Sequence, residues 1–299
     1  MMQLGVSTGL YEFAGIPLQG AIEHISRFGI HYIDVLAHGT HNPTSMPIKE
    51  QLRIAKLMEK HDMRAACVIT CPKGNDANYA SDDKDEQEFM LQQAKLAGYF
   101  VKELGGRLVM LGTGVGHRDY YLPEERAMEN SANFMRKFAE WCDKMDLVPI
   151  IELEPAQAQV CHNIESTYKY VQMVNMPNVA VNMDICHLHV LRTRPDECAI
   201  LKDRIIHMHL SDSPGREHSN PVLGEGTANV NWFVEQCHAW NIEKTAASFG
   251  EKQAVATLEV GHAANGHLIP DPDHCLVKSL SYLMYNCPSL RDDTGRDIL

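Results

Sequence analysis

Short apolar runs rich in Val, Ile and Leu alternate along the chain with longer segments whose apolar residues recur at helical spacing. Short runs bounded by turn residues are typical of buried strands, and apolar residues three and four positions apart are typical of amphipathic helices. The runs predict eight strands: QLGVSTG (3–9), HYIDVLAH (31–38), RAACVITC (64–71), RLVMLGTG (107–114), VPIIELEP (148–155), VAVNMDIC (179–186), RIIHMHLSD (204–212) and AVATLEVG (254–261).

The segments between these runs predict eight helices: 17–28, 47–61, 84–104, 123–145, 164–175, 195–202, 230–240 and 270–286. In the second of them, Ile48, Leu52, Ala55 and Met58 fall on one face. Strands and helices that alternate in this number and length predict an α/β fold, a (β/α)₈ barrel that forms a single domain over residues 1–286. The polar residues 287–299 are predicted to be a C-terminal tail.

A doubly wound open sheet is the main alternative to the barrel. The glycine-rich loop GTGVGHRDYY (112–121) follows a predicted strand, as a dinucleotide-binding loop would. It continues into His-Arg-Asp-Tyr-Tyr instead of a helix, so the dinucleotide signal is weak.

Composition places the chain among globular proteins without a membrane partner. Apolar residues make up 44% of its 299 residues, enough for a large core, yet none of the apolar runs reaches the length of about 18 residues that a transmembrane helix needs. The first residues, MMQLGVSTGLYEF, lack the basic region and apolar stretch of a signal peptide. These features predict a soluble cytoplasmic protein.

Charge and cysteine content exclude further classes. The net charge is −12, from 27 basic and 39 acidic residues without a basic cluster, so a nucleic-acid partner is not expected. The nine cysteines are odd in number and contain no Cys-x-x-Cys pair, Cys67 and Cys71 being the closest approach to one. This pattern argues against a disulfide framework and a thiolate zinc site, and it predicts reduced cysteines in the core.

Potential metal ligands stand at the ends of four consecutive predicted strands. The fifth strand ends near Glu154, the sixth at Asp184, the seventh at His209 and the eighth at Glu259. In a (β/α)₈ barrel the chemistry is placed at the carboxyl ends of the strands, where neighbouring ends lie close together. We therefore expect these four side chains to converge.

Strand parity leaves two choices open. Glu152 and Glu154 share one face of their strand, and His207 and His209 share one face of theirs. We select Glu154 and His209 because each lies nearer the carboxyl end. One imidazole and three carboxylates form an oxygen-rich set that suits one divalent ion, with Mn²⁺ favoured over Mg²⁺, Co²⁺ or Zn²⁺.

The second half of the chain resembles the sugar phosphate isomerase/epimerase superfamily, the xylose isomerase-like TIM barrels. The resemblance covers residues 148–260 and rests on IELEP, HNIES, MDICHLH, HMHLSDSPG, LGEGTANVNW and LEV in this order. Asp-x-x-His, His-x-x-Asp and Gly-Glu-Gly are modest signals singly and strong ones in this spacing. The family pattern implies Glu154, Asp184, His209 and Glu259 as metal ligands, Glu154 and Glu259 as the proton-transferring groups, and His187 as a substrate contact.

The resemblance implies an isomerase or epimerase of a small sugar or keto-polyol that works through a metal-bound enediolate. A metal that chelates the carbonyl and the neighbouring hydroxyl makes the adjacent C–H more acidic. One carboxylate removes the proton, and one on the opposite face returns it inverted. Loss of a β-hydroxyl from the same enediolate gives a lyase or dehydratase on a keto-sugar or keto-inositol, which is the alternative interpretation.

The sequence departs from two subfamilies. Ketose 3-epimerases carry a further glutamate six residues beyond the first ligand, where Val160 follows Glu154, and their arginine after strand seven has only Arg216, one residue further along, as a counterpart. The abasic-site endonucleases need an Asp-x-His after strand seven, and REHSNPV has none. An endonuclease and a non-catalytic sugar-binding subunit are therefore the less favoured alternatives.

Histidines in the predicted loops complete the list of candidate residues. His38 and His41 follow the second strand and His117 the fourth, and each is either a substrate contact or a solvated loop histidine. We select His38, His117 and Arg216, with His187, for substrate binding. The expected partner is a small polyhydroxy carbonyl compound, and a homo-oligomer is expected by analogy alone. The substrate and the choice between isomerisation, epimerisation and elimination stay open.

Overall fold

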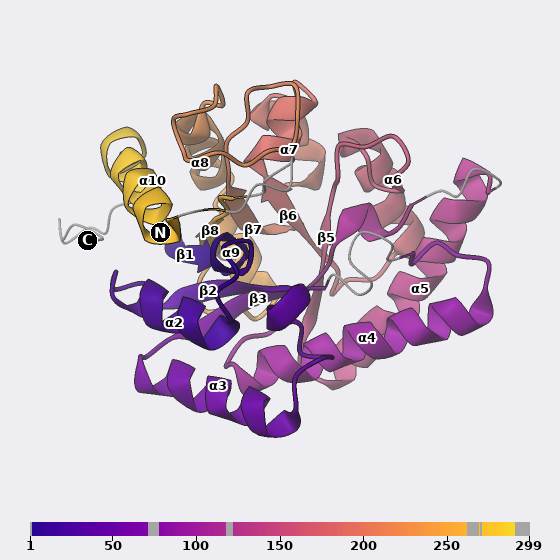
Figure 1. The fold of residues 1–299 in the computed structure, drawn as a ribbon. Coiled ribbons are helices and arrows are strands. Elements are labelled where there is room, and N and C mark those ends of the chain that lie inside the picture. Colours follow the sequence, from indigo (N-terminus) through magenta and orange to yellow (C-terminus); the bar gives the residue numbers. More distant parts are fainter. Residues whose placement is uncertain (1, 71–77, 118–121, 262–268, 270, 291–299) are drawn as a thin grey trace.

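The computed structural model is a closed barrel of eight parallel strands in chain order (Figure 1). It describes residues 2–70, 78–117, 122–261, 269 and 271–290. The predicted (β/α)₈ barrel is confirmed. The strands are β1 (Gln3–Ser7), β2 (Tyr32–Ala37), β3 (Arg64–Thr70), β4 (Leu108–Leu111), β5 (Val148–Glu152), β6 (Ala180–Asp184), β7 (Ile205–Leu210) and β8 (Val255–Leu258).

Helices surround the barrel (Figure 1). The α-helices are α1 (Gly9–Glu12), α2 (Leu18–Ser26), α3 (Ile48–Lys60), α4 (Lys84–Glu103), α5 (Glu124–Lys144), α6 (Ile164–Val174), α7 (Ile185–Val190), α8 (Val230–Ala239), α9 (Ile242–Ser248) and α10 (Pro272–Asn286). The 3₁₀ helices are η1 (Gly39–His41), η3 (Thr113–Val115), η4 (Pro195–Leu201) and η5 (Pro288–Leu290). The segment 195–202, predicted as an α-helix, is thus the 3₁₀ helix η4. The sequence pattern did not predict α1, α7 or α9.

The structure describes only the first residues of the predicted polar tail. Residues 287–299 begin with η5, in which Leu290 is buried, and residues 291–299 lie outside the described part. Cys71 and residues 118–121 of the glycine-rich loop also lie outside it. The cysteines that the structure describes are all free.

The outer helices pack one apolar face on the barrel. Helix α5 starts after Pro123, with acidic side chains in its first turn where the helix dipole favours them, and it buries Phe134 and Phe138. Helix α3 differs from the expected orientation: Ile54 and Met58 are buried, but Ile48 is 74% exposed. In the described part of the chain, none of the helices is long and apolar enough to cross a membrane.

The interior of the barrel carries polar side chains at two register shifts. The pairing of β2 with β3 shifts between Ile33 and Asp34, and the pairing of β6 with β7 shifts between Val181 and Asn182. Such irregularities change the direction in which the neighbouring side chains point. Asp34 contacts His207 across the barrel, since β2 and β7 are not neighbouring strands.

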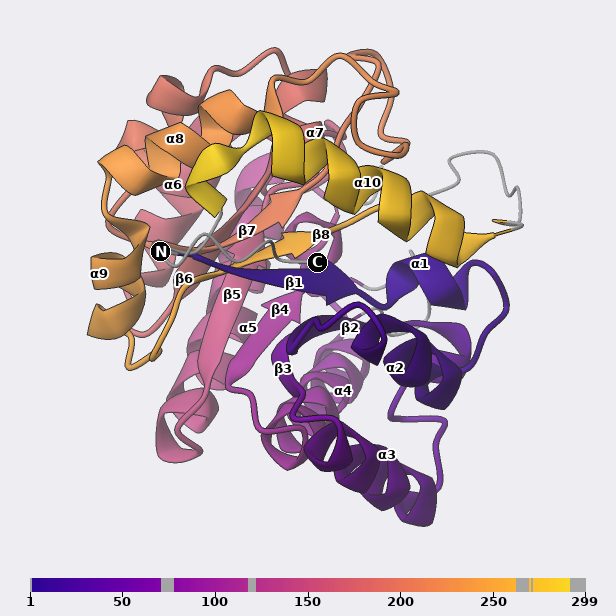
Figure 2. The ribbon, with the colours of Figure 1, turned by 90° about the vertical axis from the view of Figure 1, so that its left-hand side faces the viewer.

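Helix α10 is held to the N-terminal helices. Figure 2 shows α10 passing over β8 toward α1. At its first turn, the Asp273 carboxylate accepts a hydrogen bond from the Tyr11 hydroxyl (2.8 Å) and pairs with His24 Nδ1 (2.8 Å). Burial and this carboxylate raise the pKa of Tyr11 far above its usual range, so it stays a neutral donor. The contact ties the last helix to the first ones.

Candidate active site

Four side chains meet at the carboxyl end of the barrel around one imidazole nitrogen. His209 Nδ1, from β7, lies 2.9 Å from Glu152 Oε1, 3.3 Å from Asp184 Oδ2 and 3.1 Å from Glu259 Oε2. Glu152 ends β5, Asp184 ends β6, and Glu259 follows β8, where its backbone N–H still bonds to Leu210 of β7. We call Glu152, Asp184, His209 and Glu259 the four-donor cluster.

The carboxylate of Asp34 fixes the tautomer of His209. Its Oδ2 lies 2.7 Å from His207 Nε2 and 3.2 Å from His209 Nε2, and all three side chains are fully buried. A carboxylate only accepts hydrogen bonds, so both Nε2 atoms must donate to it. Burial alone would raise the pKa of Asp34, but the two imidazoles outweigh it and hold this pKa well below its usual range. When His209 is neutral, its Nδ1 therefore directs a lone pair toward three carboxylates.

This arrangement requires a positive charge at its centre. Among the described residues, His209 Nδ1 and Asp184 Oδ2 are buried without a hydrogen bond of good geometry, although they lie 3.3 Å apart. Burial alone would lower the pKa of His209, but Glu259 and Glu152 raise it well above its usual range, so a proton supplies the charge when nothing else does. A divalent cation would supply it instead. One imidazole and three carboxylates fit a hard divalent ion.

The structure places Glu152, and not the expected Glu154, as the fifth-strand residue of the four-donor cluster. The strand ends at Glu152 instead of continuing to residue 155, and Glu152 is the glutamate beside His209. Beyond it the chain turns away, because the Glu154 N–H bonds to the Cys161 carbonyl in the following loop. Counted from Glu152, the sixth residue is Ala158, so the family's additional glutamate is missing here too.

Two asparagines that the sequence analysis did not single out hold the two glutamates. Asn182 Nδ2 donates to Glu152 Oε1 (2.5 Å), and Asn220 Nδ2 donates to Glu259 Oε2 (3.3 Å). Asn182 shares the inward face of β6 with Asp184, which is a parity signal that could have identified it. Asn220 comes from the loop after β7, where no periodic pattern points to it.

A second group of side chains lies beside the four-donor cluster. His218 Nδ1 is 3.2 Å from Glu154 Oε1, and His218 Nε2 is 3.2 Å from His187 Nε2. His187 is also bonded through Nδ1 to the Leu153 carbonyl (2.6 Å). We call Glu154, His187 and His218 the mouth cluster. Burial disfavours the charged form of His187, yet the carboxylates of Asp184 and Glu154 outweigh it and raise its pKa to about 9.

Asp212 holds the loop that brings His218 and Asn220 over the barrel. Its carboxylate is buried and accepts four backbone N–H groups, those of Ser213, Gly224, Gly226 and Ala228, at 2.7–3.0 Å. A side chain at Gly226 would collide with this carboxylate, since an added Cβ would lie 2.2 Å from Oδ1. The aspartate of the His-x-x-Asp motif thus accepts hydrogen bonds from the backbone of the Gly-Glu-Gly motif, and the two motifs together close one loop.

Asp212→Asn is expected to loosen this loop. The amide keeps one accepting oxygen and turns a donor toward two backbone N–H groups, each of which costs about 1–3 kcal/mol when it is buried without an acceptor. The free energy of unfolding should fall by about 2–6 kcal/mol, and amide hydrogen exchange should accelerate at Gly224, Gly226 and Ala228. Glu225→Gln is the control, because its half-exposed carboxylate pairs with Lys278 at the surface and should change little. Unchanged exchange rates in Asp212→Asn would contradict this role.

The remaining predicted substrate contacts are placed less centrally. Arg216 is exposed on the loop after β7. His38 pairs with Glu12 (3.2 Å) at the end of β2, and half-buried His117 lies in a short bridge to Gln159 after β4. His41 is buried between Thr8 Oγ1 and the Ile16 carbonyl, which gives it a structural position. Their contact with a substrate stays a prediction.

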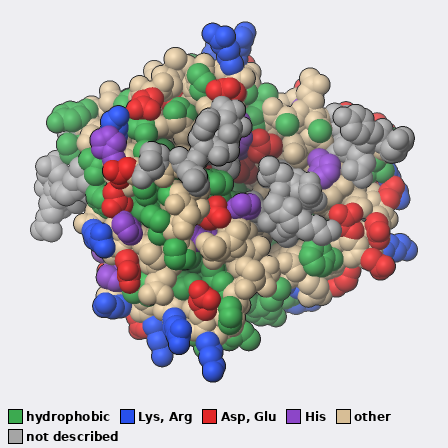
Figure 3. Space-filling view, in the orientation of Figure 1, with side chains coloured by type: hydrophobic (Ala, Val, Ile, Leu, Met, Phe, Trp, Pro, Cys, Tyr) green, Lys and Arg blue, Asp and Glu red, His purple; other side chains and the backbone are tan. Residues whose placement is uncertain are grey.

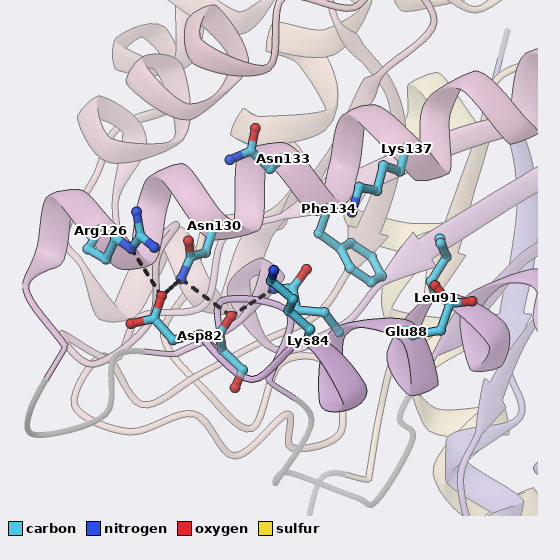
Figure 4. Close-up of a pocket in the computed structure, with 11 residues that line it drawn as sticks. Asp82, Lys84, Glu88, Leu91, Arg126, Asn130, Asn133, Phe134 and Lys137 are labelled. Atoms are coloured by element: carbon cyan, nitrogen blue, oxygen red, sulfur yellow. Dashed lines mark hydrogen bonds and ion pairs between the residues drawn. The ribbon is translucent and has the colours of Figure 1, made fainter.

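The charge distribution distinguishes the centre of this face from its edge. In Figure 3, acidic and histidine side chains occur in the middle of the face, whereas Lys and Arg side chains stand near its outline. A different hollow lies between α4 and α5, outside the barrel (Figure 4). There Asp82 is bonded to Arg126 (3.0 Å) and Asn130 (2.7 Å), so these three polar side chains satisfy one another. The barrel mouth is therefore the better candidate site.

Comparisons with known proteins agree with this fold. The family model of the xylose isomerase-like TIM barrel matches residues 22–248. No curated protein matches the chain by sequence. Among solved structures, the chain is similar to a D-tagatose 3-epimerase-like protein, with 18% identity, a TM-score of 0.77 and coverage of 97% of this chain and 98% of that one.

Two further structures are similar at lower identity. A D-allulose 3-epimerase from Methylomonas sp., in complex with D-allulose, is 16% identical with a TM-score of 0.75, and covers 95% and 97% of the two chains. A probable 3-DHS dehydratase from Bacillus anthracis is 13% identical with a TM-score of 0.69, over 95% and 99%. The match of the family model over most of the chain decides the assignment: the chain belongs to the xylose isomerase-like TIM-barrel family.

Proposed function

We propose that this chain is a divalent-metal-dependent isomerase or epimerase of a small sugar or keto-polyol. The observation that carries the proposal is the convergence of three carboxylates on His209 Nδ1, whose lone pair is exposed to them by the hydrogen bond of Nε2 to Asp34. A site of this composition suits a cation flanked by two glutamates from different strands. Sugar epimerases among the structural neighbours support the reaction class.

In this proposal Glu152, Asp184, His209 and Glu259 hold one divalent ion, for which we favour Mn²⁺. Glu152 takes the place that the sequence pattern assigned to Glu154. When bound, the ion would polarise the carbonyl and neighbouring hydroxyl of the substrate and so lower the pKa of the C–H between them. Mg²⁺, Co²⁺ and Zn²⁺ are the other candidates.

Glu152 and Glu259 are proposed to move the proton. They project from β5 and from the end of β8, which are separated in the barrel by β6 and β7, so they approach the centre from different sides. One carboxylate oxygen removes the substrate proton, and the other returns a proton to the opposite face or to the neighbouring carbon. The amides of Asn182 and Asn220 keep each carboxylate oriented toward the centre. His187, at the rim, is proposed to donate a hydrogen bond to a substrate hydroxyl.

Elimination at the same site is the alternative within enzymes. The fold similarity to a probable 3-DHS dehydratase supports it, and so does the presence of Ala158 where ketose 3-epimerases carry a glutamate. Both reactions begin with removal of a proton beside a carbonyl, so the same first step serves either outcome. The fate of the intermediate depends on whether a hydroxyl leaves from the next carbon.

The test is proton exchange between substrate candidates and solvent. A panel of ketoses, keto-inositols and oxidised glycosides is incubated in D₂O with the Mn²⁺-loaded protein and followed by NMR. We expect deuterium incorporation at one carbon beside the carbonyl of at least one compound. A chelator should abolish the exchange, and added Mn²⁺ should restore it.

Analysis of the products from the same incubation distinguishes epimerisation or isomerisation from elimination. An epimer or isomer that carries deuterium supports the first proposal, and an unsaturated product that has lost water supports the alternative. Heat-denatured protein with the same Mn²⁺ concentration is the control for metal-catalysed exchange in solution. Exchange that persists undiminished after complete removal of metal would refute the metal-dependent proposal.

A further inference from the structure

The two carboxylate oxygens of Asp184 have different surroundings. Asp184 ends β6 and caps helix α7, which follows without a loop. Its Oδ1 accepts the backbone N–H of His187 (2.8 Å) and the hydroxyl of Ser211 (3.0 Å). A carboxylate oxygen offers two lone pairs, and these two donors occupy both of them. Oδ1 therefore has no lone pair left for a metal ion.

The other oxygen of this carboxylate, Oδ2, faces the four-donor cluster. Within the described part of the chain it is buried without a hydrogen bond of good geometry, and it lies 3.3 Å from His209 Nδ1. In Glu152 and in Glu259, by contrast, the oxygen that faces His209 is the same one that accepts an asparagine amide. Asp184 thus divides its two roles between two atoms, with Oδ1 held by hydrogen bonds and Oδ2 directed at the centre.

Ser211 is itself held in a fixed direction. It follows directly after β7, the strand next to β6, and it is fully buried. Its Oγ accepts the backbone N–H of Cys186, in the first turn of α7, at 2.8 Å. A carboxylate only accepts hydrogen bonds, so the single hydroxyl proton of Ser211 must point to Asp184 Oδ1. The hydroxyl therefore joins β7 to the start of α7 and to the Asp184 carboxylate at once.

We propose that Ser211 is a positioning residue that makes Asp184 a fixed ligand, through Oδ2 alone, for the divalent ion of the four-donor cluster. This inference rests on the proposed function, because it concerns the same ion. Two donors on Oδ1 keep the carboxylate from rotating, and they also leave Oδ1 without a lone pair that could take a proton from a substrate. Proton transfer is thereby left to Glu152 and Glu259.

Ser213→Ala is the matched control for Ser211→Ala. Ser213 is also fully buried, and its hydroxyl likewise accepts one backbone N–H, that of Gly215, at 2.8 Å. It donates its proton to the Glu217 carbonyl (3.0 Å) instead of to Asp184. The two substitutions remove the same two kinds of hydrogen bond at positions two residues apart. They differ in whether the lost hydroxyl contacts a member of the four-donor cluster.

The test is a titration of the metal-free, full-length proteins with Mn²⁺, followed by electron paramagnetic resonance. We expect Ser211→Ala to bind Mn²⁺ about 10-fold or more weakly than the wild type, because the ligand loses the group that orients it. The zero-field splitting of the bound Mn²⁺ should also change, since it depends on the arrangement of the ligand atoms. Ser213→Ala should keep the affinity and the spectrum of the wild type. Cooperative unfolding of each metal-free variant in urea shows that it is folded.

The outcomes distinguish this inference from the proposed function. Equal affinity and an unchanged spectrum in Ser211→Ala would overturn the positioning role of Ser211 and leave the proposed function intact. An equal loss of affinity in both variants would overturn it as well, because the effect would then follow from loosened packing after β7. A wild type that binds no Mn²⁺ would refute the metal-dependent function, and this inference with it.

Discussion

Glu152→Gln is expected to lower the rate of substrate C–H exchange by about 10³-fold or more, because it removes a proposed base together with one ligand of the divalent ion. The amide that replaces the carboxylate keeps the size of the side chain and an oxygen for the Asn182 amide, so the barrel should stay folded. The affinity for Mn²⁺ should fall at the same time, since His209 Nδ1 would face two carboxylates instead of three. Exchange is measured in D₂O at saturating Mn²⁺, and Mn²⁺ affinity by electron paramagnetic resonance.

Glu154→Gln is the matched comparison. The two glutamates are two residues apart and share strand parity, but Glu154 lies beside His218 and not beside His209. We expect it to leave Mn²⁺ affinity at the four-donor cluster unchanged and to slow exchange by less than Glu152→Gln does. If Glu154→Gln abolished exchange while Glu152→Gln retained it, the assignment from geometry would be wrong and the one from the sequence pattern right.

Asp34→Asn should have the second-largest effect, on stability and on metal affinity together. The wild-type carboxylate accepts hydrogen bonds from two buried imidazoles, and removal of one partner of such a buried ionic group costs about 3–5 kcal/mol. Since Asp34 fixes the tautomer of His209, the affinity for Mn²⁺ should fall by about 10–100-fold. Denaturant unfolding of the metal-free protein and Mn²⁺ titration measure the two effects.

The stability difference should depend on pH in one direction. The pKa of Asp34 is held below its usual range in the folded protein, so its contribution is fully present above the unfolded pKa of about 3.9 and is lost as the pH falls through the folded value. The gap between wild type and Asp34→Asn should therefore be constant near neutrality and narrow in acid. Asp146→Asn serves as control, because its carboxylate is 79% exposed beside Arg107 and should contribute little. A gap that widened in acid would contradict this account.

The barrel could be predicted from the sequence because its strands are buried on both faces and its helices on one. Each strand thus appears as a short apolar run, and the ligands stand where the runs stop. Asp184, His209 and Glu259 were placed together on this ground, and the structure brings a carboxylate oxygen of Asp184 and of Glu259 within 3.3 Å of His209 Nδ1. Helix α7 was missed because it continues directly from β6, with the Asp184 side chain as its N-terminal cap.

The choice between Glu152 and Glu154 could not be made locally. Both satisfy the parity of β5, and the end of the strand depends on a backbone bond from Glu154 to Cys161 in the loop that follows. Asp34 was missed for a similar reason, because a register shift between β2 and β3 determines the direction in which its side chain points. His218 and Asn220 reach the site only through the folding of their loop on Asp212.

The anchoring of that loop has a consequence for how new specificities can arise in this scaffold. Both of its ends are fixed by the Asp212 carboxylate, at Ser213 on one side and at Gly224, Gly226 and Ala228 on the other. Residues 214–219 can thus vary in sequence or length while the barrel strands and Asn220, the partner of Glu259, stay in place, and each doubling of loop length costs only about 0.6 kcal/mol in closure entropy. Substitutions or insertions there would exchange the groups that face the substrate without rebuilding the metal ligands. The loop is therefore the natural segment to randomise in a library that seeks activity on new polyols.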